Sequence, residues 1–395
     1  MKLKELCKAL DGKAPAKLYA MDHDKVGLFV GDLESDVKKV LTVTDASSDA
    51  IDFAAENNID LILCHHPFMF QPVGRMVYGA DGMTAEKFAP IRNVEDDTVM
   101  ENKLAKLVKN NIAVFSMHTN LDSVPGGLND IFCKLLGLKN CVPIETKKEK
   151  FYMFIGFVLP EFKEKVLNAL FETGAGCKDN YKNVHFDFKG MGNFTPMGEA
   201  VPFIGETGRA EKTEEECFSL LVSEFDLDNV AETYKKVHPY EVPVYYVAES
   251  PECNYLPSIG RVGDLDEEMS VEDFARYCEN AFQIPYVKYS FNCDRNKKIK
   301  RVGICSGSGG SMIDEACNMG ADAFCCGDIK HDHFLRATDR GIVAFDLGHY
   351  ETECTSSIVL ENYIKDIDEN IETVNFEVVR GNKLICRLKN EGVEL

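Results

Sequence analysis

The chain has 395 residues, a formal net charge of −21, and 45% hydrophobic and 28% charged residues. This composition is typical of a soluble globular protein, and the length predicts two or three domains, since one domain usually contains about 100–200 residues. The acidity disfavours nucleic acids and acidic membranes as partners, because it repels their phosphate groups. No run of about 18 apolar residues occurs and the N-terminus lacks a secretory core, so we expect a cytoplasmic protein without a membrane span.

The chain contains 15 cysteines, and none of them forms a C-x-x-C pair that would indicate a zinc ribbon or finger. Several of them, including Cys64, Cys305 and Cys325, lie within apolar runs, where cysteine acts as a small hydrophobic residue. We therefore predict reduced thiols in a reducing compartment.

The first group of predicted elements is a strand over residues 38–45, a helix over 47–57 and a strand over 59–64. Apolar residues at helical spacing indicate the helix, and the run IDLILC indicates a buried strand. A further apolar strand is expected over 112–117. Short connections of this kind are typical of a parallel α/β sheet.

The same pattern returns at an offset of 262 residues, so that Val40 aligns with Val302 and Asp60 with Asp322. In this second group, strands are expected over 300–307, 321–326 and 342–347, and a helix over 311–319. The repeat predicts two related α/β halves. The alternative is chance similarity between two common patterns.

The segment between these halves differs from both and predicts an inserted domain. Its expected strands cover 151–159, 183–189, 214–222 and 242–248, its helices 161–172 and 226–237, and its Gly- and Pro-rich turns 190–208. This order is typical of a ferredoxin-like split β-α-β sandwich. The predicted domains are therefore residues 1–147 and 253–395, which form the two halves of one α/β domain, and the insert 148–252.

Histidines and carboxylates follow three of the predicted strands. His65 and His66 end the strand 59–64, His118 and Asp122 follow the strand 112–117, and His349 and Glu353 follow the strand 342–347. Functional groups of open α/β sheets gather at the carboxyl ends of the strands, so these side chains are expected to meet. Such nitrogen and oxygen ligands suit Zn²⁺, Fe²⁺ or Mn²⁺, and a bridging carboxylate would suit two ions.

The adjacent histidines place a condition on this metal site. Neighbouring residues of a regular strand point to opposite faces, so His65 and His66 can join one cluster only if the chain leaves strand geometry, which Pro67 favours. His349 and Glu353 are four residues apart and would share one face of a helix. The alternative is that these histidines are caps or hydrogen-bonded core residues.

Other motifs are less specific. Residues 306–311, SGSGGS, join a strand to a helix and could bind phosphate through backbone N–H groups, but no P-loop lysine follows, so we favour a tight turn. The HPYE stretch at 238–241 is interpreted as a turn without a catalytic role. Near the motifs, Arg75, Lys330 and Arg336 are the cations expected to attract an anionic substrate.

Six stretches carry a family resemblance. They are HDKVGLFVGD (23–32), KKVLTVTDAS (38–47), LILCHHPFMF (61–70), MHTNLDSVPGGLND (117–130), GDIKHDHFLRA (327–337) and GHYETE (348–353). In both content and order, the chain resembles the Nif-like dinuclear-metal family, also named GTP cyclohydrolase 1 type 2 homologues. The middle segment is similar to the CutA/PII-like insert of that family.

The resemblance implies a ligand set and an assembly. The implied metal ligands are His65, His66, Asp122, His349 and Glu353, with Glu353 bridging two divalent ions. It also implies a ring-like homohexamer built from trimers. Two departures from the family pattern are His23, where tryptophan is usual, and Asp332, where a second histidine is common and the extra one stands at His333.

The resemblance further implies hydrolysis of GTP at C8 of the guanine ring, with release of formate. In that reaction His118 is expected to shuttle a proton without being an essential ligand, because its unperturbed pKa suits the task. The alternatives are a two-metal phosphoesterase acting on a small nucleotide and a non-enzymatic metal-binding or regulatory scaffold.

Overall fold

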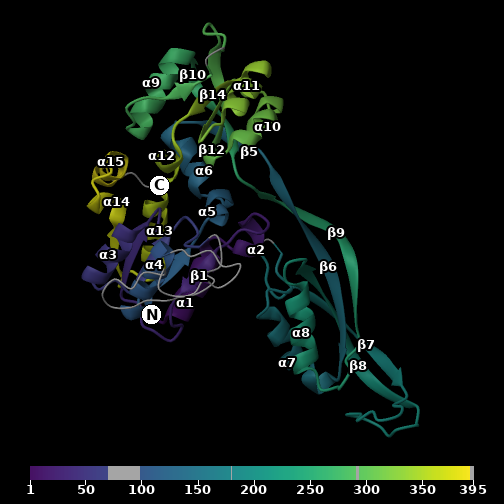
Figure 1. Ribbon diagram of the computed structural model, residues 1–395. Helices are drawn as coiled ribbons and strands as arrows, with labels where there is room; N and C mark the ends of the chain where they lie inside the picture. The colour runs from purple at the N-terminus through teal and green to yellow at the C-terminus, as the bar shows by residue number, and fades with distance from the viewer. Residues whose placement is uncertain (70–97, 179, 291–292, 392–395) are drawn as a thin grey trace, which may run out of the picture. The chain divides into compact units, whose positions relative to one another are not determined.

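The computed structural model describes residues 1–69, 98–178, 180–290 and 293–391, so Phe70 of the HHP stretch and the expected cation Arg75 lie outside it. The chain divides into two compact units, one formed by Met1–Thr146 with Pro257–Leu395 and the other by Lys147–Leu256. Their elements are labelled in Figure 1. In the part of the chain that is described, no helix is long and apolar enough to cross a membrane.

The first sheet of the larger unit has the order β1-β4-β3-β2-β15. Its strands are β1 (Gly27–Val30), β2 (Lys39–Val43), β3 (Leu61–Cys64), β4 (Ala113–Ser116) and β15 (Glu372–Asn375). All neighbours are parallel except β1, which runs antiparallel to β4. The helices α3 (Ser48–Glu56) and α4 (Thr98–Lys109) alternate with the parallel strands along the chain. All residues of β3 are buried, as expected for an apolar strand covered on both faces.

The second sheet has the order β11-β14-β13-β12-β10-β5. Its strands are β5 (Lys139–Pro143), β10 (Arg261–Ser270), β11 (Lys288–Tyr289), β12 (Lys298–Ser308), β13 (Ala323–Gly327) and β14 (Val343–Asp346). β12, β13 and β14 are parallel to one another, and the other strands pair antiparallel. The helices α10 (Ile313–Asn318) and α11 (His331–Asp339) alternate with the parallel strands.

The repeat predicted from the sequence is present in the pairing of the strands. Val40 faces Leu61 in the first sheet, and Val302 faces Ala323 in the second, so the register is the same at the offset of 262. The side chain of Asp60 accepts hydrogen bonds of 2.8 and 2.9 Å from the backbone N–H groups of residues 38 and 39. Asp322 accepts equivalent bonds of 3.1 and 3.0 Å from residues 300 and 301. The predicted α/β fold class is confirmed.

The two sheets also exchange elements, which the sequence did not indicate. α6 (Leu128–Leu135) follows the first group of strands but packs against β12, with Phe132 in the core of the second sheet. α13 (Ser356–Ile367) follows β14 but packs against β2, with Leu360 in the core of the first sheet. β5 and β15 complete the exchange as edge strands. Each sheet therefore obtains part of its apolar cover from the other half of the sequence.

The smaller unit contains β6 (Thr146–Val158), α7 (Lys163–Phe171), β7 (His185–Phe194), β8 (Glu211–Ser223), α8 (Leu227–Val237) and β9 (Tyr245–Pro257). Its sheet has the order β7-β8-β6-β9, and α7 and α8 lie together on one face (Figure 1). The prediction of turns over 190–208 was wrong for its first residues. β7 continues to Phe194, because backbone pairing with β8 stabilises a strand despite the weak propensity of Gly190 and Gly192.

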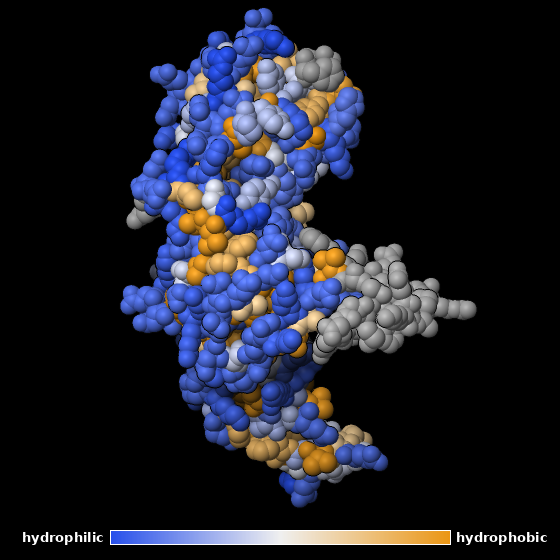
Figure 2. Space-filling model, turned by 60° about the vertical axis from the view of Figure 1, so that its left-hand side comes forward, coloured by the Kyte–Doolittle hydropathy of each residue, from blue (hydrophilic) through white to orange (hydrophobic). Residues whose placement is uncertain are grey.

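The remaining elements are α1 (Leu3–Lys13), α2 (Ala16–Tyr19), α5 (Thr119–Ser123), α9 (Val271–Phe282), α12 (His349–Glu353), α14 (Phe376–Val379), α15 (Lys383–Glu391) and the 3₁₀ helices η2 (Pro160–Phe162) and η3 (Gly310–Met312). Hydrophilic residues predominate on the face drawn in Figure 2, in accord with the charged composition. The short helices α5 and α12 begin directly after β4 and β14 and carry the side chains considered next.

Candidate metal centre

The chain turns sharply where β3 ends. The backbone N–H groups of His65 and His66 both donate to the carbonyl oxygen of Thr44, at 3.1 and 3.0 Å, instead of alternating as in a strand. As a result, the two imidazole rings lie on the same side, with their centroids 5.0 Å apart. The exit from strand geometry that the sequence required before Pro67 is therefore present.

Two short helices supply the other predicted side chains. His118 is the N-cap of α5, and Asp122 lies within it and is buried. His349 is the first residue of α12 and Glu353 its last, one helical turn away. The helix α5 starts directly after the carboxyl end of β4, and α12 starts directly after that of β14. The side chains of these helices, although distant in the sequence, therefore lie close together.

The five predicted ligands converge on Glu353, as the distances between their donor atoms show. His66 Nε2 and His349 Nε2 lie 2.9 and 3.0 Å from Glu353 Oε2. His65 Nε2 lies 3.6 Å from Glu353 Oε1 and 3.9 Å from Asp122 Oδ2. Two groups that could hold a metal ion result, His65–Asp122–Glu353 and His66–His349–Glu353, and in each the ligand atoms lie within 4.8 Å of one another. Glu353 belongs to both groups.

The hydrogen bonds around these residues suit a bound cation. His65 Nδ1 lies 2.8 Å from the carbonyl oxygen of Met117, which only accepts, so Nδ1 carries the hydrogen and Nε2 offers a lone pair. His65 Nε2 is buried and has no hydrogen-bond partner among the described residues, and Glu353 Oε1 lies 3.6 Å from it. Buried acceptors that face one another are stabilised by a cation between them, and an imidazole–carboxylate set suits a divalent transition metal.

A family model described as Duf34/NIF3 (NGG1p interacting factor 3) matches residues 1–82 and 86–382 of the chain. The chain belongs to the Duf34/NIF3 family. A protein of Staphylococcus aureus strain Mu50 named GTP cyclohydrolase 1 type 2 homolog is 31% identical over 381 residues, which cover 96% of each chain. A protein of the same name from Staphylococcus epidermidis strain RP62A is 30% identical over 370 residues, 93% of each chain. The predicted family is confirmed.

Solved structures of NIF3 relatives agree with this assignment. A Bacillus cereus protein related to NIF3 has a TM-score of 0.69 at 25% identity, covering 94% of this chain and 96% of that one. A Staphylococcus aureus protein has a TM-score of 0.67 at 27% identity, covering 95% of each. The similarity extends over nearly the whole chain and therefore includes both sheets and the smaller unit.

In this NIF3 chain, two of the predicted ligand histidines have matching carboxylate partners. Nδ1 of His66 lies 2.8 Å from Asp45, and Nδ1 of His349 lies 2.8 Å from Asp328. A carboxylate on Nδ1 fixes the ring and directs the Nε2 lone pair toward an ion, as partners of metal-bound histidines usually do. The two Nε2 atoms accordingly face each other at 3.3 Å. The sequence did not single out Asp45 or Asp328, because their role depends on the folded ring positions.

When no ion competes, neighbouring carboxylates stabilise the protonated forms of His66 and His349. Although burial opposes its charged form, hydrogen bonds to Asp45 and Glu353 raise the pKa of His66 to about 10. The hydrogen bond to Glu353 is the main reason that the pKa of His349 rises to about 9. Despite burial, the neighbouring histidines hold the pKa of Glu353 well below its usual range. Metal binding at this cluster must therefore displace protons from the histidines.

The SGSGGS turn lies against the cluster. The hydroxyl of Ser306 donates to Asp122 Oδ1 at 2.6 Å and thereby holds this carboxylate in place. Gly307 has a φ of +59°, and a Cβ there would meet Glu353 Oε1 at 2.1 Å and His349 Nε2 at 3.1 Å. Glycine is thus required for the second sheet to approach the ligands. The expected tight turn with close packing accounts for this motif.

His118 lies beside the ligand histidines. Its ring centroid is 5.3 Å from that of His65 and 5.7 Å from that of His66, and the three form a further group of possible ligands. Its Nδ1 lies 2.8 Å from Asp24, which also accepts from the backbone N–H of Thr119. Although burial opposes ionisation, these bonds hold the pKa of Asp24 below its usual range. Asp24 was part of a family stretch but was not predicted as a site residue.

The two departures from the family pattern lie outside these groups. His23 is exposed and has a left-handed backbone with a φ of 67°. Asp332 is exposed in the first turn of α11. His333 packs against Gly310, and its Nδ1 is buried without a hydrogen-bond partner in the described part of the chain. None of the three contributes to a metal-ligand group found there.

The cations near the cluster differ from those expected. Arg336 donates three hydrogen bonds of 2.7–3.0 Å to Asp314, which offsets its charge, and Lys330 is exposed as the N-cap of α11. Instead, Lys103 of α4 and Arg380 after α14 line a cleft beside His66. Sequence analysis missed both, because neither lies near a motif and only the fold brings them there.

Proposed function

We propose that this NIF3 protein is a two-metal hydrolase that acts on C8 of the guanine ring of GTP and releases formate. The strongest support is Glu353, whose carboxylate is shared by the His65–Asp122 and His66–His349 ligand groups. The name GTP cyclohydrolase 1 type 2 homolog, carried by two relatives of 30% and 31% identity, supports the reaction class.

Two divalent ions in such a site, whether Zn²⁺, Fe²⁺ or Mn²⁺, supply Lewis acidity and lower the pKa of water. The contribution of the chain is to fix the ligands before the substrate arrives. Asp45 and Asp328 orient His66 and His349, and Ser306 holds Asp122. The burial of Glu353 and Asp122 keeps the local dielectric low, which strengthens every charge interaction there.

We further propose that His118 moves a proton in this reaction and is not an essential ligand. Because Asp24 holds its Nδ1, Nε2 is the nitrogen left to exchange a proton with the substrate ring. In His118→Ala, full metal content with a fall in kcat of roughly 10²–10⁴-fold would support this role. Reduced metal content would instead make His118 a ligand or an orienting residue. Unchanged metal content and turnover would remove it from the mechanism.

The test of the proposed function is direct. Protein loaded with Zn²⁺, Fe²⁺ or Mn²⁺ is incubated with GTP, and released formate and released phosphate are measured separately, with Glu353→Gln as the inactive control. Formate release that is lost in the variant is the expected result. Phosphate without formate would identify a two-metal phosphoesterase. Neither product from fully loaded protein would contradict catalysis and favour a metal-binding scaffold.

Two structural proposals accompany this function. We propose that residues 148–252 form a ferredoxin-like domain that contributes no metal ligand, supported by the order β-α-β-β-α-β of the smaller unit. Replacing it with a short linker should leave metal content unchanged. We also propose a homohexamer, which rests on the family resemblance, since closed symmetry can enclose a site. Light scattering that gave a monomer at micromolar concentration would refute it.

A further inference from the structure

A cleft of about 640 Å³ lies beside the candidate metal centre. His66 and His349 form one part of its lining, and Phe68, Tyr350, Lys103 and Arg380 form much of the rest. This volume is in the range of about 300–1,000 Å³ that is usual for small-molecule sites. A ligand that filled the cleft would contact the histidines of one candidate metal group and both cations.

Lys103 is held at one wall of the cleft. Its Nζ donates to the carbonyl oxygen of Ala46 at 3.2 Å, just before the N-terminus of α3, where the Ser47 side chain accepts from the N–H of Ala50. Ala46 and Ser47 also line the cleft, so the positive end of the helix dipole adds to the charge of Lys103.

Arg380 is held at the cleft by a different contact. Its guanidinium lies over the ring of Phe376, 5.8 Å from the centroid, and the residue is exposed. Nearby, the hydroxyl of Tyr350 donates to the buried carboxylate of Glu377 and accepts from Asn382 at 3.0 Å. These bonds fix the aromatic ring of Tyr350 that lines the cleft.

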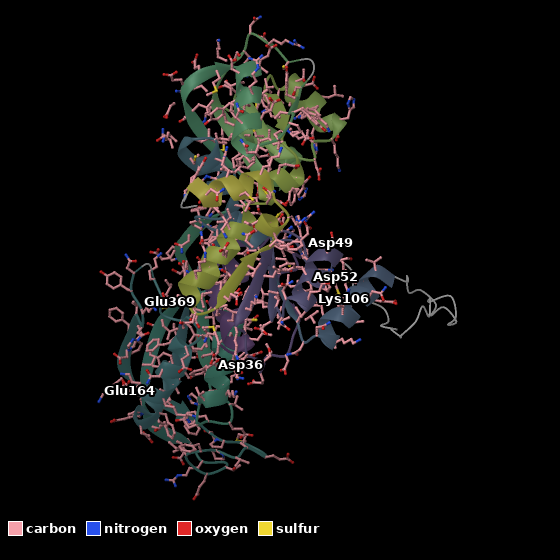
Figure 3. All side chains as sticks on the ribbon, turned by 90° about the vertical axis from the view of Figure 1, so that its left-hand side faces the viewer. Asp36, Asp49, Asp52, Lys106, Glu164 and Glu369 are labelled. Atoms are coloured by element: carbon pink, nitrogen blue, oxygen red, sulfur yellow. The ribbon has the colours of Figure 1, made fainter. Side chains whose placement is uncertain are left out.

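The two cations are distinguished by their lack of acidic partners. Among the residues that the structure describes, neither Lys103 nor Arg380 has a carboxylate within 4.0 Å. By contrast, Lys106, one turn further along α4, pairs with Asp52, and both are labelled together in Figure 3. Asp45 also lines the cleft, but its carboxylate is bonded to His66. The chain has a net charge of −21, but in the lining of this cleft two cations accompany a single carboxylate, Asp45.

We propose that Lys103 and Arg380 bind the phosphate groups of a phosphorylated small-molecule substrate whose reacting part lies at the metal centre. This inference rests on the proposed function, because it assigns the substrate-binding residues of the same site. Arginine binds phosphate in a bidentate manner and lysine as a point charge, so the pair suits a flexible polyphosphate. The two cations would also explain how an acidic protein holds a polyphosphate, since the electrostatic field of the rest of the protein repels anions.

The test uses binding, so that it does not depend on turnover. Metal-loaded protein is titrated with inorganic pyrophosphate by calorimetry, and metal content is checked before and after. Lys103→Gln and Arg380→Gln should each raise the Kd about 10-fold, the effect of losing one bond to a charged group. The charge-conserving Lys103→Arg and Arg380→Lys should restore most of the affinity.

A lysine and an arginine that lie away from the cleft serve as matched controls. Lys106→Gln on α4 and Arg276→Gln on α9, an exposed arginine beside Asp273, remove the same charges away from the cleft and should change the Kd less than about 2-fold. Equal weakening by all four variants, or wild-type protein that does not bind pyrophosphate, would overturn the proposal.

The formate assay separates this proposal from the proposed function. Pyrophosphate binding that depends on Lys103 and Arg380, without formate release from GTP, would retain the phosphate site and reject the cyclohydrolase reaction. Formate release by Lys103→Gln and Arg380→Gln at the wild-type kcat and KM would retain the reaction and reject the phosphate site.

Discussion

The two sheets of the larger unit share a scaffold but supply the candidate metal ligands from different positions. At the end of β3, the first sheet carries His65 and His66. At the equivalent positions of the second sheet, offset by 262 residues, Gly327 ends β13 and Asp328 follows it. A Cβ on Gly327 would lie 2.5 Å from the backbone N and Cα of His349, so α12 starts directly over this glycine.

The difference shows that the same strand pairing can carry different residues at its carboxyl edge. The pairing register and the Asp60 and Asp322 bonds are the same in both sheets, whereas the residues at their carboxyl edges are not. Each sheet nonetheless contributes one predicted ligand histidine, His66 or His349, whose Nδ1 is bonded to a carboxylate at 2.8 Å. Glu353 comes from the second sheet, on α12. Its carboxylate belongs to both candidate ligand groups and so joins them.

Removing Glu353 should have the largest effect, because it alone belongs to both groups. In Glu353→Gln we expect the dissociation constants of both ions to rise by more than about 100-fold, beyond the usual cost of losing an outer partner. Elemental analysis after dialysis measures this. Glu351→Gln, on the same helix, is the control. Loss of only one ion from Glu353→Gln would show that the carboxylate does not bridge.

Gly327→Ala should come next, because the added methyl group meets backbone atoms that cannot move aside easily. We expect a loss of stability of about 1–3 kcal/mol in urea unfolding and weaker metal binding through displacement of His349. Gly12→Ala, where no atom lies within 4 Å, is the control and should be neutral or slightly stabilising. An unchanged Gly327→Ala protein would mean that α12 does not pack closely on β13.

Asp45 and Asp328, the carboxylate partners of His66 and His349, can be tested by the same substitution. Asp45→Asn and Asp328→Asn should each weaken metal binding by roughly 10–100-fold, because the amide can no longer fix the imidazole tautomer as a carboxylate does. Competition with a chelator of known affinity would measure both. A large effect in one variant and none in the other would show that the two histidines are not equivalent.

The smallest effect is expected at Asp60 and Asp322, whose equivalent hydrogen bonds occur in both sheets. Asp60→Ala and Asp322→Ala each remove a carboxylate that accepts from two backbone N–H groups at a strand start. Each should cost about 1–2 kcal/mol of unfolding free energy, since the sites are partly exposed. Urea denaturation should give similar values for both, and a difference above about 1 kcal/mol would argue against equivalent roles.

The sequence predicted those features that depend on local pattern. Apolar runs located the strands, and the register of the repeat followed from one alignment at 262 residues. Their positions at strand ends predicted that His65, His66, His118, Asp122, His349 and Glu353 lie in one region, because parallel strands share a carboxyl edge. The family resemblance, and not this argument, singled out the five other than His118 as metal ligands.

Features that depend on tertiary packing were missed. The apolar faces of α6 and α13 indicate burial but not which sheet covers them, so the exchange between halves was not predicted. Asp24 and Asp45 act only through the folded positions of His118 and His66. Lys103 and Arg380 are separated by 277 positions in the chain and lie in no motif, so their common cleft appears only in the fold.

The central claim is that two metal ions bind between the sheets and share Glu353. A crystal of the protein soaked in Zn²⁺ and measured at the zinc absorption edge tests it most directly. The expected result is two anomalous peaks about 3.5–4 Å apart, one beside His65 and Asp122 and the other beside His66 and His349, with Glu353 contacting both. A single peak, or peaks that Glu353 does not contact, would contradict the account.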